Sequence, residues 1–145
     1  MKIFIKSIII LVFLGFILPS VFAQKKCTIT IKIEGIKNRS GKIYAGLKND
    51  PNNFLGEGTN IKSVSTEVTK EGDVILKFEG VFEGKYAIVI YQDLNDNKIL
   101  DMNGQIPNEP FGFSNVTMLM GPPNFEQCAF DLTEDKAISI GLFIF

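Results

Sequence analysis

The sequence predicts an all-β protein, an antiparallel β-sandwich of about seven strands that is immunoglobulin-like or prealbumin-like. Apolar residues recur at every second position in several short segments, and clusters of Gly, Asn, Asp and Pro separate these segments. After residue 23 no segment carries an apolar stripe with the 3.6-residue period of a helix. Short alternating strands between turn signals are typical of sandwiches, and a Gly-Lys-Tyr entry into a central strand resembles the two named types.

Seven segments fit the strands of this sandwich. Residues 27–34 alternate cleanly between apolar and polar side chains, as in a strand with one solvated face. Residues 85–92 are the most apolar, so we expect a central strand covered on both faces. Residues 61–69 and 74–79 flank a tight turn, so we expect them to pair as a hairpin. The expected strands are residues 27–34, 42–48, 61–69, 74–79, 85–92, 127–132 and 136–144.

The chain begins with the three parts of a secretory signal peptide. Lys2 and Lys6 form a charged start, Ile8 to Leu18 is apolar, and Val21-Phe22-Ala23 fits a cleavage site. The apolar run is shorter than the ~20 residues of a membrane-spanning helix. We therefore expect residues 1–23 to be removed on export to the periplasm, the cell surface or the medium, with no membrane span in the remaining chain. A retained anchor is the alternative.

Residues 24–145 are long enough for a single β-sandwich domain with its own core. Without the two lysines of the leader the chain has 13 basic and 16 acidic residues, a formal charge of −3. Nucleic-acid-binding domains carry basic patches, so we expect no nucleic-acid partner.

Two cysteines, Cys27 and Cys128, remain in the exported chain, where an oxidising compartment allows a disulfide. Cys27 opens the first expected strand, and Cys128 lies in the penultimate one. A bridge closes a loop of about 100 residues, which stabilises the fold by about 4–5 kcal/mol in the chain-entropy model. We expect this disulfide, with two free or buried thiols as the alternative.

A long segment, residues 93–126, precedes the last two expected strands. It holds four prolines together with several glycines and phenylalanines. Loops beyond about 12–15 residues without secondary structure tend to be functional or disordered, and the apolar content argues against disorder. We therefore expect an ordered loop, held by packing alone or by packing together with an ion.

This segment opens with the spacing of a cation site. Asp93, Asn95, Asn97 and Asp101 stand at ligand positions 1, 3, 5 and 9 of an EF-hand-type calcium loop, and the carbonyl of Ile99 stands at position 7. The glycine of position 6 and the glutamate of position 12 are missing, which excludes a true EF-hand. We expect a modest calcium site. A plain turn whose side chains cap their own backbone is the alternative.

A second stretch of the segment places aromatic side chains beside polar ones, as a ligand-binding loop does. Its candidate ligand contacts are Glu109, Phe111, Phe113 and Ser114. In the alternative interpretation Phe111 and Phe113 only cap one end of the sandwich core.

The chain contains no histidine. This removes the commonest general base, the Ser-His and Cys-His nucleophile pairs, and the commonest transition-metal ligand. Carboxylates remain, because Asp93, Asp101 and Glu109 share one loop region, and paired carboxylates hydrolyse glycosides. Solvated or structural carboxylates are commoner, so we expect a protein that is not an enzyme.

Three consecutive blocks lie between Gly84 and Leu132. They read G-K-Y-A-I-V-I-Y-Q-D-L-N-D-N-K-I-L-D, G-Q-I-P-N-E-P-F-G-F-S-N and G-P-P-N-F-E-Q-C-A-F-D-L. This series resembles the bacterial family known as domain of unknown function 2141. The resemblance implies export to the envelope and a small β-rich domain, and it implies no catalytic residues because the family has no established activity. Val116 departs from the small residue that usually follows the second block.

Together these observations predict an exported, non-catalytic binding or accessory domain with a calcium-stabilised loop. Its partner is expected to be an envelope glycan or protein. The alternatives are a carboxylate-dependent hydrolase of envelope glycans and a purely structural envelope protein.

Overall fold

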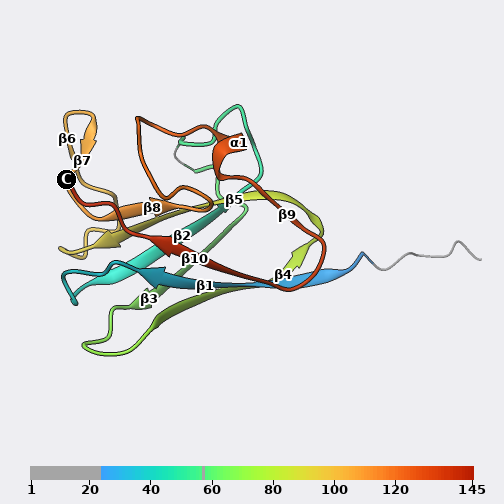
Figure 1. Ribbon diagram of the computed structural model, residues 1–145, viewed down its shortest axis with the longest axis horizontal. Coiled ribbons are helices and arrows are strands. Elements are labelled where there is room, and N and C mark those ends of the chain that lie inside the picture. Colours follow the sequence, from blue (N-terminus) through green and yellow to red (C-terminus); the bar gives the residue numbers. More distant parts are fainter. Residues whose placement is uncertain (1–23, 57) are drawn as a thin grey trace, which may run out of the picture.

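The computed structural model describes residues 24–56 and 58–145 (Figure 1). The expected signal peptide, residues 1–23, lies outside the described residues. Within the described part of the chain, no helix is long and apolar enough to span a membrane. The described elements are β1 (Lys26–Glu34), β2 (Lys42–Lys48), β3 (Lys62–Glu67), β4 (Val74–Phe82), β5 (Gly84–Asp93), β6 (Met102–Asn103), β7 (Ile106–Pro107), β8 (Phe111–Phe113), α1 (Phe125–Cys128), β9 (Phe130–Leu132) and β10 (Lys136–Gly141).

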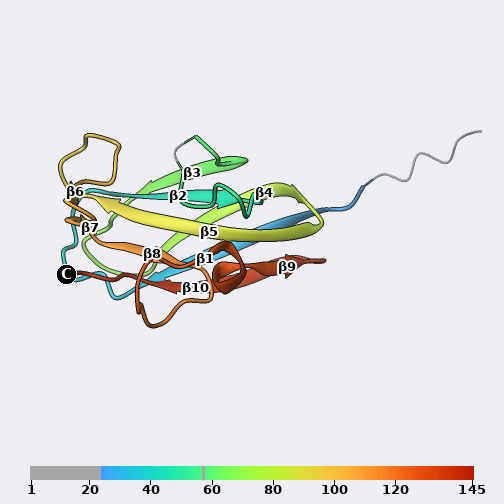
Figure 2. The same ribbon diagram turned by 90° about the horizontal axis from the view of Figure 1, so that it is seen from above.

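The fold is all-β, as the sequence predicts, and most strands belong to two sheets. One sheet has three strands in the order β10-β1-β4. The other has five, in the order β3-β2-β5-β8, with β9 pairing with a different part of β5. The short strands β6 and β7 form a separate hairpin. Figure 2 shows β1 and β10 lying across from β2 and β3.

The larger hydrophobic cluster, here called the inner core, lies between the two sheets. Ile29, Ile31 and Ile33 of β1 point into it, which confirms the alternation predicted for residues 27–34. Side chains from β2 and β5 meet them from the facing sheet. Fully burying one isoleucine stabilises a fold by about 1.5–3 kcal/mol relative to leaving it exposed, so this periodicity fixes which face of each strand turns inward.

The prediction that residues 85–92 form a central strand is confirmed. β5 pairs with β2 on one side and with β8 and β9 on the other. Ile88 and Ile90 point into the inner core, whereas Ala87 and Val89 point to the opposite face, where a second cluster packs. A strand buried on both faces reads as a continuous apolar run, which is the pattern seen in the sequence.

The hairpin expected between residues 61–69 and 74–79 is wrong. β3 pairs with β2, and β4 pairs with β1, so the turn between them carries the chain from one sheet to the other. The two strands also differ in burial, because β3 is a largely exposed edge strand whereas β4 buries every second side chain along most of its length. A tight turn between two strands allows a hairpin but does not require one.

The end of the chain differs from the prediction in two respects. Residues 125–128 form one helical turn, because Asn124 and Gln127 make a reciprocal capping box, with bonds of 2.9 and 3.0 Å between each side chain and the backbone N–H of the other residue. The predicted strand 127–132 is thus reduced to β9. The last strand, β10, runs parallel to β1 rather than antiparallel.

The disulfide expected between Cys27 and Cys128 is not formed, and both cysteines are free and buried. Cys27 packs in the inner core, whereas Cys128 ends the helical turn and packs in the second cluster, on the other face of the five-stranded sheet. The five-stranded sheet separates the two thiols. The disulfide that we expected from two cysteines in an exported chain is therefore wrong.

Candidate functional site

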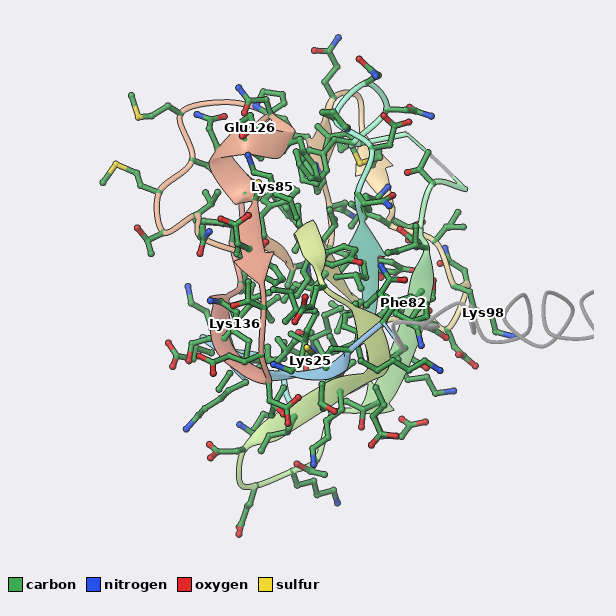
Figure 3. All side chains as sticks on the ribbon, turned by 90° about the vertical axis from the view of Figure 1, so that its right-hand side faces the viewer. Lys25, Phe82, Lys85, Lys98, Glu126 and Lys136 are labelled. Carbon is green, nitrogen blue, oxygen red and sulfur yellow. The ribbon has the colours of Figure 1, made fainter. Side chains whose placement is uncertain are left out.

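The second hydrophobic cluster, here called the outer cluster, covers the face of the five-stranded sheet that points away from the inner core. It consists of Phe54, Ala87, Phe111, Phe113, Phe125 and Cys128. Its aromatic rings pack edge to face, with centroids 5.8 Å apart for Phe111 and Phe113 and for Phe54 and Phe125. The ion pair between Lys85 of β5 and Glu126 of α1 ties the helical turn to the start of β5 (Figure 3).

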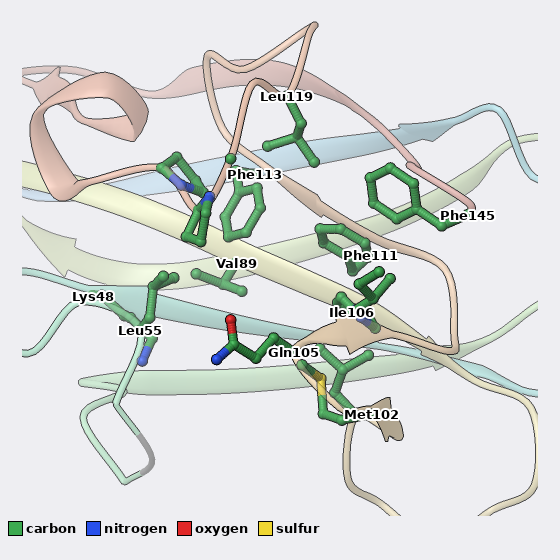
Figure 4. Close-up of a pocket in the computed structure, with 15 residues that line it drawn as sticks. Lys48, Leu55, Val89, Met102, Gln105, Ile106, Phe111, Phe113, Leu119 and Phe145 are labelled. Atoms are coloured by element: carbon green, nitrogen blue, oxygen red, sulfur yellow. The ribbon is translucent and has the colours of Figure 1, made fainter.

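A cavity of about 520 Å³, here called the pocket, opens above this face (Figure 4). Val89, Phe111 and Phe113 of the sheet line it, and Lys48 lies at one end beside Leu55. The β6–β7 hairpin and loops form its walls, through side chains that include Met102, Ile106, Leu119, Pro122, Pro123 and Phe145. Volumes of about 300–1,000 Å³ with mostly apolar linings are typical of small-molecule sites.

The rim of the pocket is apolar and exposed. Leu55, Met102, Ile106 and Phe145 are 50–78% exposed although each has a large hydrophobic side chain. In both ribbon views the C-terminus lies beside the β6–β7 hairpin, so segments far apart in sequence meet at this rim. Contiguous exposed apolar surface of this kind marks interaction sites.

A close backbone contact holds the C-terminal wall. Phe111 and Phe143 exchange two backbone hydrogen bonds, of 3.1 and 2.7 Å. Between Phe111 and Phe113, a Cβ on Gly112 would lie 2.4 Å from the carbonyl oxygen of Gly141. Only glycine allows β8 to approach the end of β10 so closely. The Phe-Gly-Phe alternation is the one signal of this contact in the sequence, and it does not indicate which segment β8 contacts.

The candidate cation loop is built around Asp93, which is 1% exposed. Its carboxylate accepts backbone N–H bonds from Asn95, Asp96 and Lys98, at 3.2, 2.7 and 2.8 Å. Burial by itself raises the pKa of Asp93, but the backbone N–H donors, that of Lys98 foremost, outweigh it, so the pKa is lowered. Asp93 is therefore an anion that holds the turn from inside.

Three other expected ligands, the side chains of Asn95, Asn97 and Asp101, lie close together. The two asparagines turn their amide nitrogens rather than their oxygens toward Asp101. The Nδ2 atoms of Asn95 and Asn97 donate to the carboxylate of Asp101, at 2.6 and 2.8 Å. Their Oδ1 atoms accept the N–H groups of Asn97 and Ile99, at 3.1 and 3.0 Å. Amide nitrogens are donors and cannot ligate a cation. In this conformation the loop satisfies itself, and within the described residues no group of three or more His, Cys, Asp or Glu is placed to hold a metal.

Glu109, predicted as a ligand contact, instead joins the two ends of this loop. Its Oε1 accepts the N–H of Leu94 at 2.8 Å, and its Oε2 accepts the N–H of Asp101 at 3.1 Å. The N–H of Asn108 donates to the carbonyl of Asp101 at 2.8 Å. The β6–β7 hairpin lies between Asp101 and Asn108 in the chain. Because Glu109 and Asn108 hold Asp101, they position this hairpin, which is one wall of the pocket.

The remaining members of the predicted ligand loop have separate roles. Phe111 and Phe113 line the pocket. Ser114 is fully buried, and its Oγ accepts the N–H of Ile88 at 2.9 Å and donates to the carbonyl of Cys128 at 2.6 Å. Ser114 thus links β5 to the helical turn and does not line the pocket.

Sequence reasoning missed Tyr91, which connects the sheet to the cation loop. Its ring stacks on Tyr44, with centroids 5.3 Å apart, and its hydroxyl donates to the carbonyl of Lys98 at 2.8 Å. Burial, with smaller contributions from Tyr44, Asp93 and Glu109, raises the pKa of Tyr91 to about 12. The hydroxyl therefore remains a neutral donor to the loop at physiological pH.

Sequence reasoning also missed Lys48, the last residue of β2. It is 6% exposed, and its Nζ donates to the carbonyl of Gly56 at 2.9 Å and to the Oγ1 of Thr59 at 2.5 Å. Burial lowers the pKa of Lys48. The available signal was its position two and four residues after Gly46 and Tyr44, which places all three on the outer face.

The family model for uncharacterised proteins conserved in bacteria (DUF2141) matches residues 31–140. This range includes the cation loop, the Phe-Gly-Phe strand and most of the pocket lining, and it confirms the resemblance drawn from the three sequence blocks. No curated protein and no solved structure matches the chain.

Proposed function

This chain belongs to the DUF2141 family of uncharacterised bacterial proteins, and we propose that it is a non-catalytic binding domain whose pocket takes an apolar ligand. The pocket itself carries the proposal. It measures about 520 Å³, and apolar side chains supply nearly all of its lining. An apolar ligand would displace water from this surface, with a gain of about 25 cal/mol per Å² of apolar area buried.

The way in which the pocket is built supports ligand binding. Its floor is a buried sheet face, where Val89 and Phe113 pair within the ladder. Its β6–β7 wall is anchored through the carboxylate of Glu109. A preformed site loses less conformational entropy on binding than one that must order first.

The proposal places the domain outside the cytoplasm, in the periplasm or at the cell surface, after removal of residues 1–23. The charged start, apolar middle and small-residue end of the leader support this placement.

We also propose that the two sheets form an immunoglobulin-like or prealbumin-like sandwich. The shared inner core supports this fold type, and the parallel β1–β10 pair departs from the antiparallel pattern.

Filling the pocket tests the proposed function. The neutral fluorescent probe N-phenyl-1-naphthylamine should brighten on binding wild-type protein, and Val89→Trp should weaken this binding at least tenfold because the indole occupies the floor. Ile75→Trp is the matched control, since Ile75 is half exposed on β4, in the other sheet. Equal probe binding by the two variants, or none by the wild type, would contradict the proposal.

We also propose that residues 93–101 bind calcium, the ion that the sequence predicts, in a conformation different from the one described above. In that conformation the side-chain amides of Asn95 and Asn97 are rotated by half a turn. Their oxygens, rather than their nitrogens, then point toward the carboxylate of Asp101, and the ion lies between them. The convergence of these three side chains supports it, as does the left-handed backbone of Lys98 (φ 66°), at the position that glycine fills in an EF-hand.

Thermal unfolding with calcium and with a chelator tests this form. A dissociation constant near 10 μM would stabilise the fold by about 2.7 kcal/mol in millimolar calcium. The melting temperature should therefore rise with calcium in the wild type, and the rise should disappear in Asp101→Asn. Identical melting curves with calcium and with chelator would contradict calcium binding and would support the alternative, a turn whose side chains bond to its own backbone.

A further inference from the structure

We propose that the ligand of the pocket is an anionic amphiphile, with an apolar chain lying over Val89 and Phe113 and a free carboxylate at Lys48. This inference rests on the proposed function, because it names the ligand class for the same pocket. It follows from the position of one buried cation among lining side chains that are otherwise uncharged.

Lys48 marks one end of the pocket. Of the described side chains that line the cavity, the ammonium group of Lys48 is the only charged one. Figure 4 shows Lys48 beside Leu55 at one end and Phe145 toward the other. A ligand that spans the pocket therefore meets a positive charge at one end and, apart from Gln105, apolar side chains along the rest of its length.

The contacts of Lys48 leave its charge without compensation in the described part of the chain. An ammonium group has three donors. Two of them bond to neutral acceptors, the carbonyl of Gly56 and the hydroxyl of Thr59. Lys48 takes part in none of the ion pairs formed by the described residues. Burying a charge is costly unless an opposite charge pairs with it, and a carboxylate of the ligand would supply that pair.

Small residues of the sheet lie beside this lysine. The β2–β5 register places Lys48 next to Ala87, and Gly46 next to Val89. Ala87 therefore contributes only a methyl group beside Lys48, while the side chain of Asn60 covers Gly46. The loop between β2 and β3 is tied to the end of β2, because the N–H of Ile61 donates to the carbonyl of Leu47 at 2.8 Å.

The far end of the pocket suits the tail of an amphiphile. Met102, Ile106 and Phe145 are large, apolar and more than half exposed there. A chain that begins at Lys48 and leaves the pocket between them would cover this surface. A neutral chain gains the same apolar contacts without the charge pair, and a cationic chain meets repulsion at Lys48.

Displacement of N-phenyl-1-naphthylamine by three amphiphiles of equal chain length tests the inference. Laurate should displace the probe at a concentration at least tenfold lower than 1-dodecanol, and dodecylamine should be the weakest. A hydrogen bond to a charged group is worth about 1.5–3 kcal/mol, and each 1.4 kcal/mol is a factor of ten in affinity. This comparison uses wild-type protein and needs no variant to fold.

Lys48→Met then assigns the preference to one residue, since methionine keeps an unbranched apolar stem. In this variant the concentrations of laurate and of 1-dodecanol that displace the probe should become about equal, so that the preference for laurate is lost. Lys77→Met, at an exposed position of β4, is the control and should retain the preference.

Three results would overturn the inference while leaving the proposed function intact. One is equal displacement by laurate and 1-dodecanol in the wild type. Another is an undiminished laurate preference in Lys48→Met. The third concerns Glu57. Glu57 lies outside the described residues. A laurate preference that emerged only in Glu57→Gln would identify Glu57 as the native counter-ion and would also overturn the inference. Failure of the probe itself to bind would overturn the proposed function.

Discussion

Two buried carboxylates set the conformation of the long segment after β5. Asp93 accepts three backbone N–H groups, and Glu109 accepts two. A buried anion needs donors, and here the loop backbone provides them. In the sequence Asp93 fits a cation site equally well, because residue type and spacing do not say whether an oxygen will meet a metal or an N–H group.

Asp93→Asn should destabilise the protein and flatten its response to acid. The folded-state pKa of Asp93 is lowered, so its contribution is fully present above the unfolded-state pKa of about 3.9 and is lost as the pH falls through the lower folded-state value. The variant should lose about 1.5–3 kcal/mol at pH 7, the range for a hydrogen bond to a charged group. Urea unfolding between pH 7 and pH 2 measures both effects.

Asp131→Asn is the control, because Asp131 is exposed on β9. It should follow the wild-type stability curve closely. If Asp93→Asn matched the wild type at pH 7 and lost stability with the same acid dependence, the structural role assigned to Asp93 would be wrong.

At the scale of elements, β5 organises both sides of the five-stranded sheet. Its alternate residues face the inner core and the outer cluster, and β8 reaches the pocket by pairing with its second half. β8 also contacts the C-terminal segment through the Phe111–Phe143 bridge. The pocket wall therefore depends on a close backbone approach at Gly112.

Gly112→Ala should destabilise the protein by about 1–3 kcal/mol, the usual cost of overpacking. The added methyl group would lie 2.4 Å from the backbone oxygen of Gly141, which cannot move aside as a side chain can. Gly141→Ala is a matched control at the other side of the same contact, because its Cβ meets nothing within 4 Å.

Thermal melting of the two alanine variants measures the difference. The melting temperature should fall by several degrees in Gly112→Ala and change little in Gly141→Ala. Equal melting temperatures would show that β8 can withdraw from β10 without cost.

At the scale of the whole molecule, apolar packing lies on both faces of one sheet, and each face buries one cysteine. Cys27 belongs to the inner core and Cys128 to the outer cluster. Burial raises the pKa of Cys128 to about 11, so its thiol is protonated and unreactive at neutral pH.

Both thiols should therefore be silent to a thiol reagent such as DTNB in the native protein and react fully in denaturant. Intact-mass measurement should give the mass of the dithiol form. A mass lower by two hydrogens, or immediate reaction of the native protein, would contradict the arrangement of the two clusters.

The sequence by itself determined the all-β class, the alternation of β1, the central position of β5 and the family. These follow from local periodicity and from the blocks between Gly84 and Leu132, which are visible without knowing which segments meet. The Asp and Asn spacing of residues 93–101 is also a local signal, and it predicted a calcium site with a self-capped turn as the alternative.

Only the tertiary structure decided which strands pair, where the thiols lie and what lines the pocket. β3 and β4 enter different sheets, although they flank a tight turn. Lys48, Val89 and Phe145 lie on segments widely separated in the sequence, yet they line one cavity. Strand pairing is set by the burial of both sheet faces at once, a long-range balance that no local pattern encodes.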